Sequence, residues 1–251
     1  DVKALMKQMV LSQTYRQSAV VKPAALAADP ANRWLSRSAR FRLDGEVLRD
    51  QALHLSGLLV PTIGGPGVKP PQPGGLWKAV GYSSSNTARF QADEEHEKVH
   101  RRSLYTFWKR TSPPPQMTTF DAPSREECRV RRERTNTPLQ ALLLMNDPQY
   151  VEAARCFAER ILAHGGKDDE SRAAWALESA TCQVPALDDV LEVCALLRAE
   201  RAVFGADPDA AKQLVAIGGA RSASECAVEE LAAWTMAANL ILNLDAVLTK
   251  S

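Results

Sequence analysis

Apolar residues recur with the period of a helix in several stretches of the chain. Near the start they stand at positions i, i+3, i+4, i+7 and i+8 behind Asp1, which is placed to cap a helix: Val2, Leu5, Met6, Met9 and Val10. This pattern predicts one buried helix face, as in the first helix of a bundle truncated at its start. A second pattern predicts a helix that begins after Asp44 and ends at Pro61, with Arg40, Arg42 and Arg49 on its exposed side and these residues inward: Val47, Leu48, Ala52, Leu55 and Leu59.

The clearest local signals mark helices in the second half of the chain. Thr137, Pro138 and Gln140 have the spacing of a capping box with proline at the first helical position, so a helix begins there. Asp147-Pro148 and Asp207-Pro208 start two more helices in the same way, and glycine pairs at 165–166 and 218–219 end them. The helix after Pro148 has an amphipathic pattern with these residues inward: Val151, Ala154, Ala158, Ile161 and Leu162. Two further amphipathic patterns predict two more helices. Their inward residues are Leu187, Val190, Leu191, Cys194 and Leu197 in one and Leu231, Trp234, Ala238, Ile241 and Leu242 in the other.

A more irregular middle separates the two helical parts. Residues 61–75 contain five prolines and five glycines, which predicts a long loop. Residues 104–108 favour a short helix, although their aromatic residues would also suit a strand, and the prolines at 113–115 must terminate it. The sequence therefore predicts a mostly α-helical fold, an irregular multi-helix bundle. Its parts are an N-terminal helical part (1–60), a Pro/Gly- and Arg-rich irregular segment (61–136) and a C-terminal helical bundle (137–251) that packs with the first part as one domain.

Composition and charge exclude several classes of function. With 45% hydrophobic and 24% charged residues the chain is typical of soluble globular proteins, and no apolar run approaches the roughly 20 residues of a membrane span. The net charge of +1 gives no reason to expect nucleic-acid binding. The five cysteines lack the spacing of a zinc site or a haem attachment, so we expect most of them to be small buried apolar residues. Nucleotide-binding and nucleophile-elbow motifs are absent from the sequence.

The sharpest chemical motif is His96-Glu97-Lys98-Val99-His100, which has the HExxH form. On a helix its two histidines lie on one face and can bind zinc, while Glu97 acts as general base on a zinc-bound water. The flanking residues are very polar for a buried active-site helix, and no later histidine stands at the spacing of known zinc proteases. The sequence offers three acidic candidates for a third ligand without choosing between them: Asp121, Glu126 and Glu127. A zinc-dependent hydrolase is thus one hypothesis.

Residues 98–134 concentrate positive charge. They carry ten lysines and arginines against four acidic residues, a net charge of +6 in a chain of net charge +1. Arginine's planar fork favours carboxylates, phosphates and sulfates, and the interleaved Tyr105, Phe107 and Trp108 suit a sugar. The segment therefore predicts an anion- or carbohydrate-binding surface, unless its arginines pair with acidic residues elsewhere and hold a loop-rich region together. Two weaker candidates are Cys128, either a reactive or a buried thiol, and His54, expected at the core or its boundary.

Several long strings resemble one family. The strings "RRSLYTFWKRTSPPPQMTTFDAPSRE", "RRERTNTPLQALLLMNDPQYVEAAR" and "LAAWTMAANLILNLD" are similar to the planctomycete PSD-one domain, a domain of unknown function. The family pattern lacks the two histidines found here at 96 and 100, which implies that HExxH is a local feature of a variable segment. A family-wide ligand site, if any, is implied among the matching residues: Arg101, Arg102, Tyr105, Trp108, Arg110, Asp121, Arg125, Arg132, Arg134, Asn136 and Gln140.

The resemblance also implies a setting for the chain. Family members usually form the C-terminal part of exported proteins that carry a c-type haem domain upstream, which implies an extracytoplasmic location and upstream domains as partners. This chain has no CxxCH motif and no signal peptide, so the haem is expected in a preceding region. The leading hypothesis is a binding or docking module for a partner domain or for an anionic or carbohydrate ligand. The alternatives are the zinc-dependent hydrolase and a part of a haem-linked sugar-oxidising enzyme.

Overall fold

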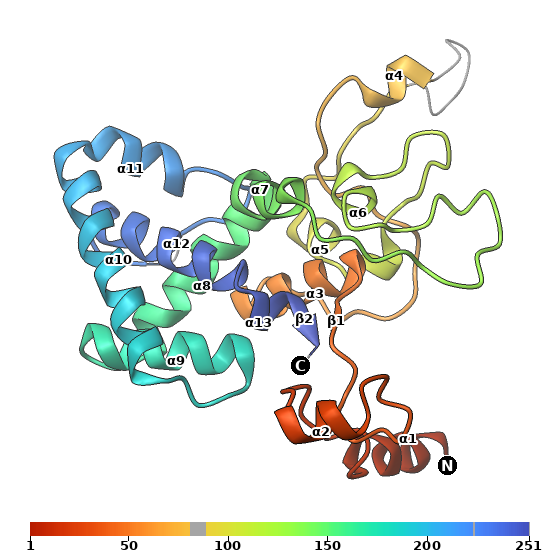
Figure 1. Ribbon diagram of the computed structural model, residues 1–251. Coiled ribbons are helices and arrows are strands. Elements are labelled where there is room, and N and C mark those ends of the chain that lie inside the picture. Colours follow the sequence, from red (N-terminus) through yellow and green to blue (C-terminus); the bar gives the residue numbers. More distant parts are fainter. Residues whose placement is uncertain (81–88, 223, 251) are drawn as a thin grey trace.

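A computed structural model describes residues 1–80, 89–222 and 224–250. The fold is mostly α-helical, as the sequence predicts (Figure 1). In the described residues the only sheet pairs strand β1 (Phe41–Arg42) antiparallel to β2 (Thr249–Lys250). The helices are α1 (Val2–Leu11), α2 (Pro23–Ala28), α3 (Gly45–Ser56), α4 (Leu76–Val80), α5 (His96–Val99), α6 (Pro115–Thr118), α7 (Pro138–Asn146), α8 (Pro148–His164), α9 (Asp169–Thr181), α10 (Leu187–Ala206), α11 (Pro208–Val215), α12 (Val228–Leu242) and α13 (Asp245–Leu248), with a 3₁₀ turn η1 (Ser103–Tyr105).

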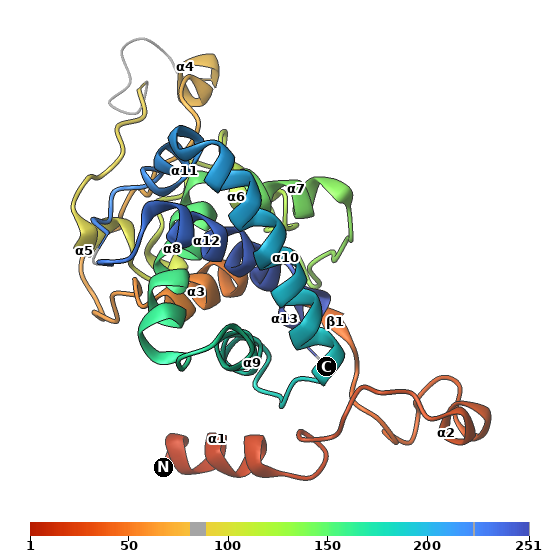
Figure 2. The ribbon, with the colours of Figure 1, turned by 90° about the vertical axis from the view of Figure 1, so that its left-hand side faces the viewer.

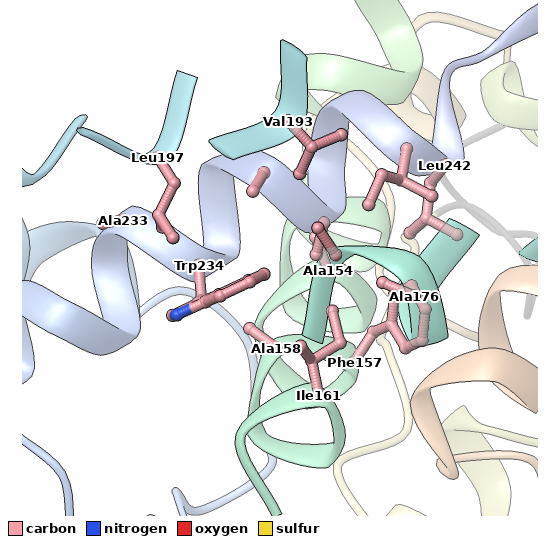
Figure 3. Packing of buried hydrophobic residues seen from close by; sticks show 14 of the residues in the cluster. Ala154, Phe157, Ala158, Ile161, Ala176, Val193, Leu197, Ala233, Trp234 and Leu242 are labelled. Carbon is pink, nitrogen blue, oxygen red and sulfur yellow. The ribbon is translucent and has the colours of Figure 1, made fainter. Parts of the chain in front are cut away.

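The main core lies in the C-terminal helical bundle. Helix α12 packs against α8, α10 and α11, and α9 closes the bundle against α8 and α10 (Figure 1). Alanines on the facing surfaces let the helices approach closely around a few large side chains, of which Trp234 and Phe157 are fully buried (Figure 3). The indole Nε1 of Trp234 donates to Glu230 Oε1 at 3.0 Å, so its polar atom is satisfied. The helices predicted at 138, 148 and 208 are confirmed, and the last helix, predicted from about Glu225, begins at Val228. The aspartate caps at Asp147 and Asp207 bind the backbone as expected.

A second core joins the N-terminal part to this bundle. Helix α3 packs on α8, and Leu48, Leu53, Phe120 and Tyr150 are buried between them and α6. The sequence placed the end of α3 at Pro61, but the helix stops at Gly57, whose φ of 78° is the left-handed C-cap conformation. The inward pattern was also wrong at one position, because Val47 is 47% exposed.

Arg49 is buried, although the helical pattern placed it on the exposed side of α3. Its guanidinium donates from Nη2 to Val99 O at 2.7 Å and from Nη1 to Arg101 O at 2.9 Å. It also donates to Ser103 Oγ and Gln149 Oε1. Five donors in one plane satisfy carbonyls that a loop would otherwise leave buried and unpaired. Arg49 therefore fixes the chain that carries His100.

Helix α1 forms as predicted but is not buried. Asp1 Oδ1 accepts from Lys3 N at 3.0 Å, which confirms the cap. Its apolar residues are nevertheless exposed, 73% for Val2 and 52% for Leu5, so the prediction of a buried face is wrong for this chain. Figures 1 and 2 both show α1 and α2 below the helical body.

The proline- and glycine-rich loop is organised by Arg101. The Arg101 guanidinium donates to the carbonyl oxygens of Thr62, Gly64 and Pro66 and lies 3.8 Å from the centre of the Tyr105 ring. Tyr105 in turn accepts at its hydroxyl from Gly64 N at 2.8 Å. The loop predicted at 61–75 therefore forms around a buried arginine.

Residues 104–108 do not form the predicted helix. Only the η1 turn is helical, and the chain then runs extended beside Val68, with Phe107 N donating to Val68 O at 2.7 Å. This pairing with a segment 39 positions away outweighs the weak local preference, and Thr106 is buried as a result.

The cysteines and His54 are less buried than predicted. Burial raises the pKa of the Cys156 thiol to about 12, and Cys194 is buried as well. The other three cysteines are exposed or partly exposed, so the expectation that most are buried is wrong: Cys128, Cys182 and Cys226. His54 lies on the exposed face of α3 rather than at the core. Among the described helices, none combines the length and the apolar character that crossing a bilayer requires.

Candidate functional site

A cleft of about 310 Å³ opens between helix α5, the start of α8 and the loop before residue 220. Its walls mix apolar side chains with a few polar groups. The lining residues are Pro71, Ala92, Asp93, Glu94, His96, Val99, His100, Pro148, Gln149, Glu152, Gly218 and Gly219. A concave site with a small number of convergent polar groups is the usual form of a small-molecule site.

Glu152 is the buried carboxylate of this cleft. Helix α8 places it among buried neighbours, and it is 4% exposed. Its Oε1 accepts from Gly219 N at 2.8 Å and Ala220 N at 2.6 Å, while Oε2 lies 3.3 Å from His100 Nε2. Burial alone raises the pKa of Glu152, but the hydrogen bonds from His100 and the two backbone N–H groups outweigh it and lower the pKa below its ordinary value. The carboxylate is therefore ionised at neutral pH.

The two histidines of the HExxH motif are in direct contact. Helix α5 is a single turn, and it brings His96 Nδ1 to 2.9 Å from His100 Nδ1. Ionised Glu152 can only accept, so the Nε2 atom of His100 carries a proton. With a neutral His100, whose lone pair is then on Nδ1, His96 donates from its own Nδ1. In that tautomer His96 keeps an unshared lone pair on Nε2.

His96 lines the cleft and also a second, more open groove of about 900 Å³. Partial burial and the neighbouring His100 lower the pKa of His96, although Glu152 and Glu97 act in the opposite direction. The imidazole is therefore neutral at neutral pH. The chain Glu152, His100, His96 ends in a group that can accept a hydrogen bond or a proton from a bound molecule.

The geometry bears on the predicted zinc site. Glu152 lies at the Nε2 edge of His100, whereas His96 lies at the opposite Nδ1 edge, so the three groups do not converge on one point. Glu97 is exposed beside them, and the proposed third ligands Glu126 and Glu127 are exposed in a different segment. Within residues 1–80, 89–222 and 224–250, no group of three or more His, Cys, Asp or Glu side chains is placed to hold a metal ion. The two histidines fit proton transfer better than metal binding.

Comparison with known proteins places the chain in a family. The model of PSD1, a family of proteins of unknown function (DUF1553), matches residues 1–197. The chain belongs to the PSD1 family. No curated protein and no solved structure matches this PSD1 chain. The match includes His96, His100 and Glu152 as well as the arginine-rich segment.

Several arginines predicted to bind a ligand are paired within this PSD1 chain. Arg132 donates to both carboxylate oxygens of Glu46, at 2.8 and 3.1 Å, and lies 3.4 Å from Asp44. Arg134 lies 3.8 Å from Asp44 and 4.2 Å from the centre of the Phe41 ring. Arg102 Nε is 3.5 Å from Asp50. These contacts tie the segment to α3 and β1, which supports the structural interpretation of the charge cluster.

The other residues of that predicted surface also have intramolecular roles. Trp108 Nε1 donates to Ser124 O at 3.0 Å, and the Arg125 guanidinium lies 4.4 Å from the centre of the Trp108 ring. Further contacts involve Asp121, which accepts from Thr135; Asn136, which accepts from Arg42; and Gln140, which donates to Thr119 O and accepts from Thr137 N. Arg110 is exposed and makes no ion pair among the described residues. None of the eleven residues lines the cleft.

Sequence reasoning found the histidines but missed Glu152 and the glycines that hold it. The available signal was that Glu152 is an acidic residue between two apolar ones, Val151 and Ala153, in an otherwise apolar part of the helix. Gly218 and Gly219 were interpreted only as a helix stop. Gly219 also donates its N–H to a carboxylate 67 positions away, and Gly218 lies close against that carboxylate; both roles require the tertiary structure.

Proposed function

We propose that this PSD1 chain is a ligand-binding module whose cleft takes a small hydroxyl-bearing molecule such as a sugar unit. The observation that carries the proposal is the hydrogen-bonded chain of Glu152, His100 and His96 in the wall of a cavity. The terminal imidazole stands in the walls of two cavities and keeps one nitrogen unshared.

The open polar groups of the cleft favour a hydroxyl donor as ligand. His96 and Glu94 are acceptors, and Asp93 is one as well, although its Oδ2 already accepts from Lys69 N at 2.7 Å. The Gln149 amide is bonded to Arg49 and Pro71. Carboxylates and an unprotonated imidazole accept hydrogen bonds from O–H groups and repel anions. Pro71, Pro148 and Val99 provide apolar surface for the C–H faces of a ring. These features together suit a neutral polyol or sugar.

A second candidate function is catalytic, and the unshared lone pair of His96 favours it. A hydroxyl or water bound at Nε2 can transfer its proton to His96, and ionised Glu152 stabilises the resulting positive charge through His100. This role is compatible with hydrolysis or with a part in sugar oxidation. The extracytoplasmic setting and an upstream c-type haem domain remain parts of the proposal, and their support is the resemblance to PSD-one sequences.

The test is a binding titration of neutral mono- and disaccharides with His96→Ala and a matched control. Calorimetry gives the affinity, and ¹⁵N shifts of the imidazole rings report contact with His96. His54→Ala is the control, because His54 is an exposed histidine outside both cavities. We expect at least one sugar to bind saturably and to lose about tenfold in affinity in His96→Ala, the value of one hydrogen bond. No saturable binding, or equal binding by both variants, would contradict the proposal.

A further inference from the structure

The groove that shares His96 with the cleft has a different chemistry. It is bounded by the end of α3, the second half of α8, the start of α9 and residues 219–221 and 224–226. His96 and Gly219 line both cavities, so the two cavities are neighbours. A ligand bound in the groove can therefore also contact His96.

Positive charge predominates in the groove. Its lining includes three arginines (Arg160, Arg172 and Arg221) and two glutamates. One of these, Glu159, is bonded to the buried Arg155, with Arg155 Nη1 donating to Glu159 Oε1 at 2.8 Å. That leaves Glu225 as the acidic group that faces the three guanidinium groups. The cleft on the other side of His96 carries Asp93 and Glu94 instead.

Arg172 and Arg221 form no ion pair among the described residues. Within the described part of the chain, the Nε of Arg172 is buried without a hydrogen-bond partner. Asp168 and Asp169 are near enough for Arg172 to help lower their pKa, yet Arg172 forms no ion pair with either. Arg221 is exposed and likewise makes no ion pair among the described residues. Arg160 is anchored at one end, because its Nη1 donates to the carbonyl oxygens of His54 and Leu55.

The position of Arg172 is fixed by close packing. A β-carbon at Gly165 would lie 2.9 Å from Arg172 Cα and 2.7 Å from Ile161 O, so only glycine lets the start of α9 approach the end of α8 this closely. This contact holds the Arg172 backbone at the wall of the groove.

We propose that this groove binds an anionic group, a carboxylate or a sulfate ester, through Arg172 and Arg221 with Arg160 beside them. This inference rests on the proposed function and names the ligand class as an acidic sugar. The hydroxyl groups of the sugar contact His96, and its anionic group lies in the groove. Guanidinium groups form short, charge-assisted hydrogen bonds with such oxyanions. The carboxylates of the cleft repel an anion from the other side, which gives the ligand one orientation. The anion site thus lies apart from the arginines of residues 98–134, which are largely paired.

The experiment compares three probes on the full chain: glucose, glucuronate and glucose 6-sulfate. Arg172→Gln with Arg221→Gln removes both charges, and the exposed Arg110→Gln is the matched control. We expect one acidic probe to bind about tenfold more tightly than glucose and to lose that advantage in the double variant but not in Arg110→Gln. The preferred probe separates a carboxylate site from a sulfate site. Should the double variant fail to fold, judged by circular dichroism, the exposed Arg221→Gln alone is expected to lose part of the advantage.

The outcomes separate this inference from the proposed function. The anion site is overturned if the double variant still binds the acidic probe more tightly than glucose. It is also overturned if Arg110→Gln loses this preference to the same extent. Equal affinity for all three probes also overturns it and leaves the cleft proposal standing. If the affinity for an acidic probe falls in the Arg172→Gln, Arg221→Gln variant but not in His96→Ala, the anion site is supported and the role of His96 is contradicted.

Discussion

Gly218 lies so close to Glu152 that a β-carbon at position 218 would sit 2.5 Å from the Glu152 carboxyl carbon. The backbone φ of Gly218 is +99°, a conformation that residues with a side chain rarely adopt. The loop can therefore bring its N–H groups to the carboxylate only if this position is glycine. The neighbouring Gly219 donates to the same carboxylate but has open space where its β-carbon would be.

The two glycines make a matched pair of substitutions. We expect Gly218→Ala to lower the free energy of unfolding by about 1–3 kcal/mol, because the loop or the Glu152 side chain must move away. Gly219→Ala is expected to change it by less than about 0.5 kcal/mol. Urea denaturation measures both, and ¹⁵N shifts of the His96 ring report whether the chain of hydrogen bonds survives. Equal effects of the two substitutions would show that the close approach to Glu152 does not constrain the loop.

The ionisation of Glu152 predicts a specific pH dependence of stability. Its pKa is lowered in the folded protein, so the carboxylate contributes stability above the ordinary glutamate pKa of 4.5 and loses it as the pH falls through the lowered pKa. Glu152→Gln keeps the shape of the side chain but cannot titrate. We expect the variant to be less stable than the original chain at pH 7 and the difference to shrink below pH 4.5.

Urea unfolding at a series of pH values checks this prediction. Other carboxylates also titrate there, so the quantity to follow is the difference between the two proteins at each pH. Asp168→Asn serves as a comparison, because hydrogen bonds from Ser171 lower the pKa of this fully exposed cap. A difference between Glu152→Gln and the original chain that stays constant from pH 7 to pH 3 would refute the role assigned to the Glu152 charge.

What the sequence predicted depends on how far apart the interacting residues are. The capping box at Thr137 and Gln140 and the caps at Asp147 and Asp207 involve partners within three positions, so their chemistry can be recognised in the sequence. Helix α9 begins with a similar local signal, Asp168 bonded to Ser171, and the sequence analysis did not recognise it. Local signals of this kind therefore predict where a helix begins.

The candidate site depends instead on long-range contacts. Glu152 is 52 positions from His100, and Arg49 is 50 positions from the Val99 carbonyl that it binds. Neither the burial of Arg49 nor the path of residues 99–103 is encoded in a helical period. The HExxH pattern places two histidines on one helical turn, but their chemistry depends on which edge of each ring faces which partner. Only the tertiary structure shows that Glu152, and not Glu97, is bonded to His100.

The arginines of residues 98–134 give the last prediction, which separates a structural role from ligand binding. Arg132 and Arg134 bind Glu46 and Asp44, so replacing both arginines with alanine unpairs two carboxylates at the start of α3. We expect a loss of about 1 kcal/mol in unfolding free energy, modest because all four side chains are partly solvated. High salt is expected to reduce the loss.

The matched control is Arg110→Ala with Arg131→Ala, two exposed arginines that form no ion pair among the described residues. The free energy of unfolding, measured in urea, should not change in this double variant, since no carboxylate loses a partner. The same two double variants, titrated with glucuronate and glucose 6-sulfate, test the binding surface that the charge pattern predicts. Unchanged affinity in Arg132→Ala with Arg134→Ala, together with reduced stability, assigns these two arginines to the fold, because a ligand site would lose affinity whether or not the chain lost stability. Reduced affinity at full stability would instead return the anion site to this segment.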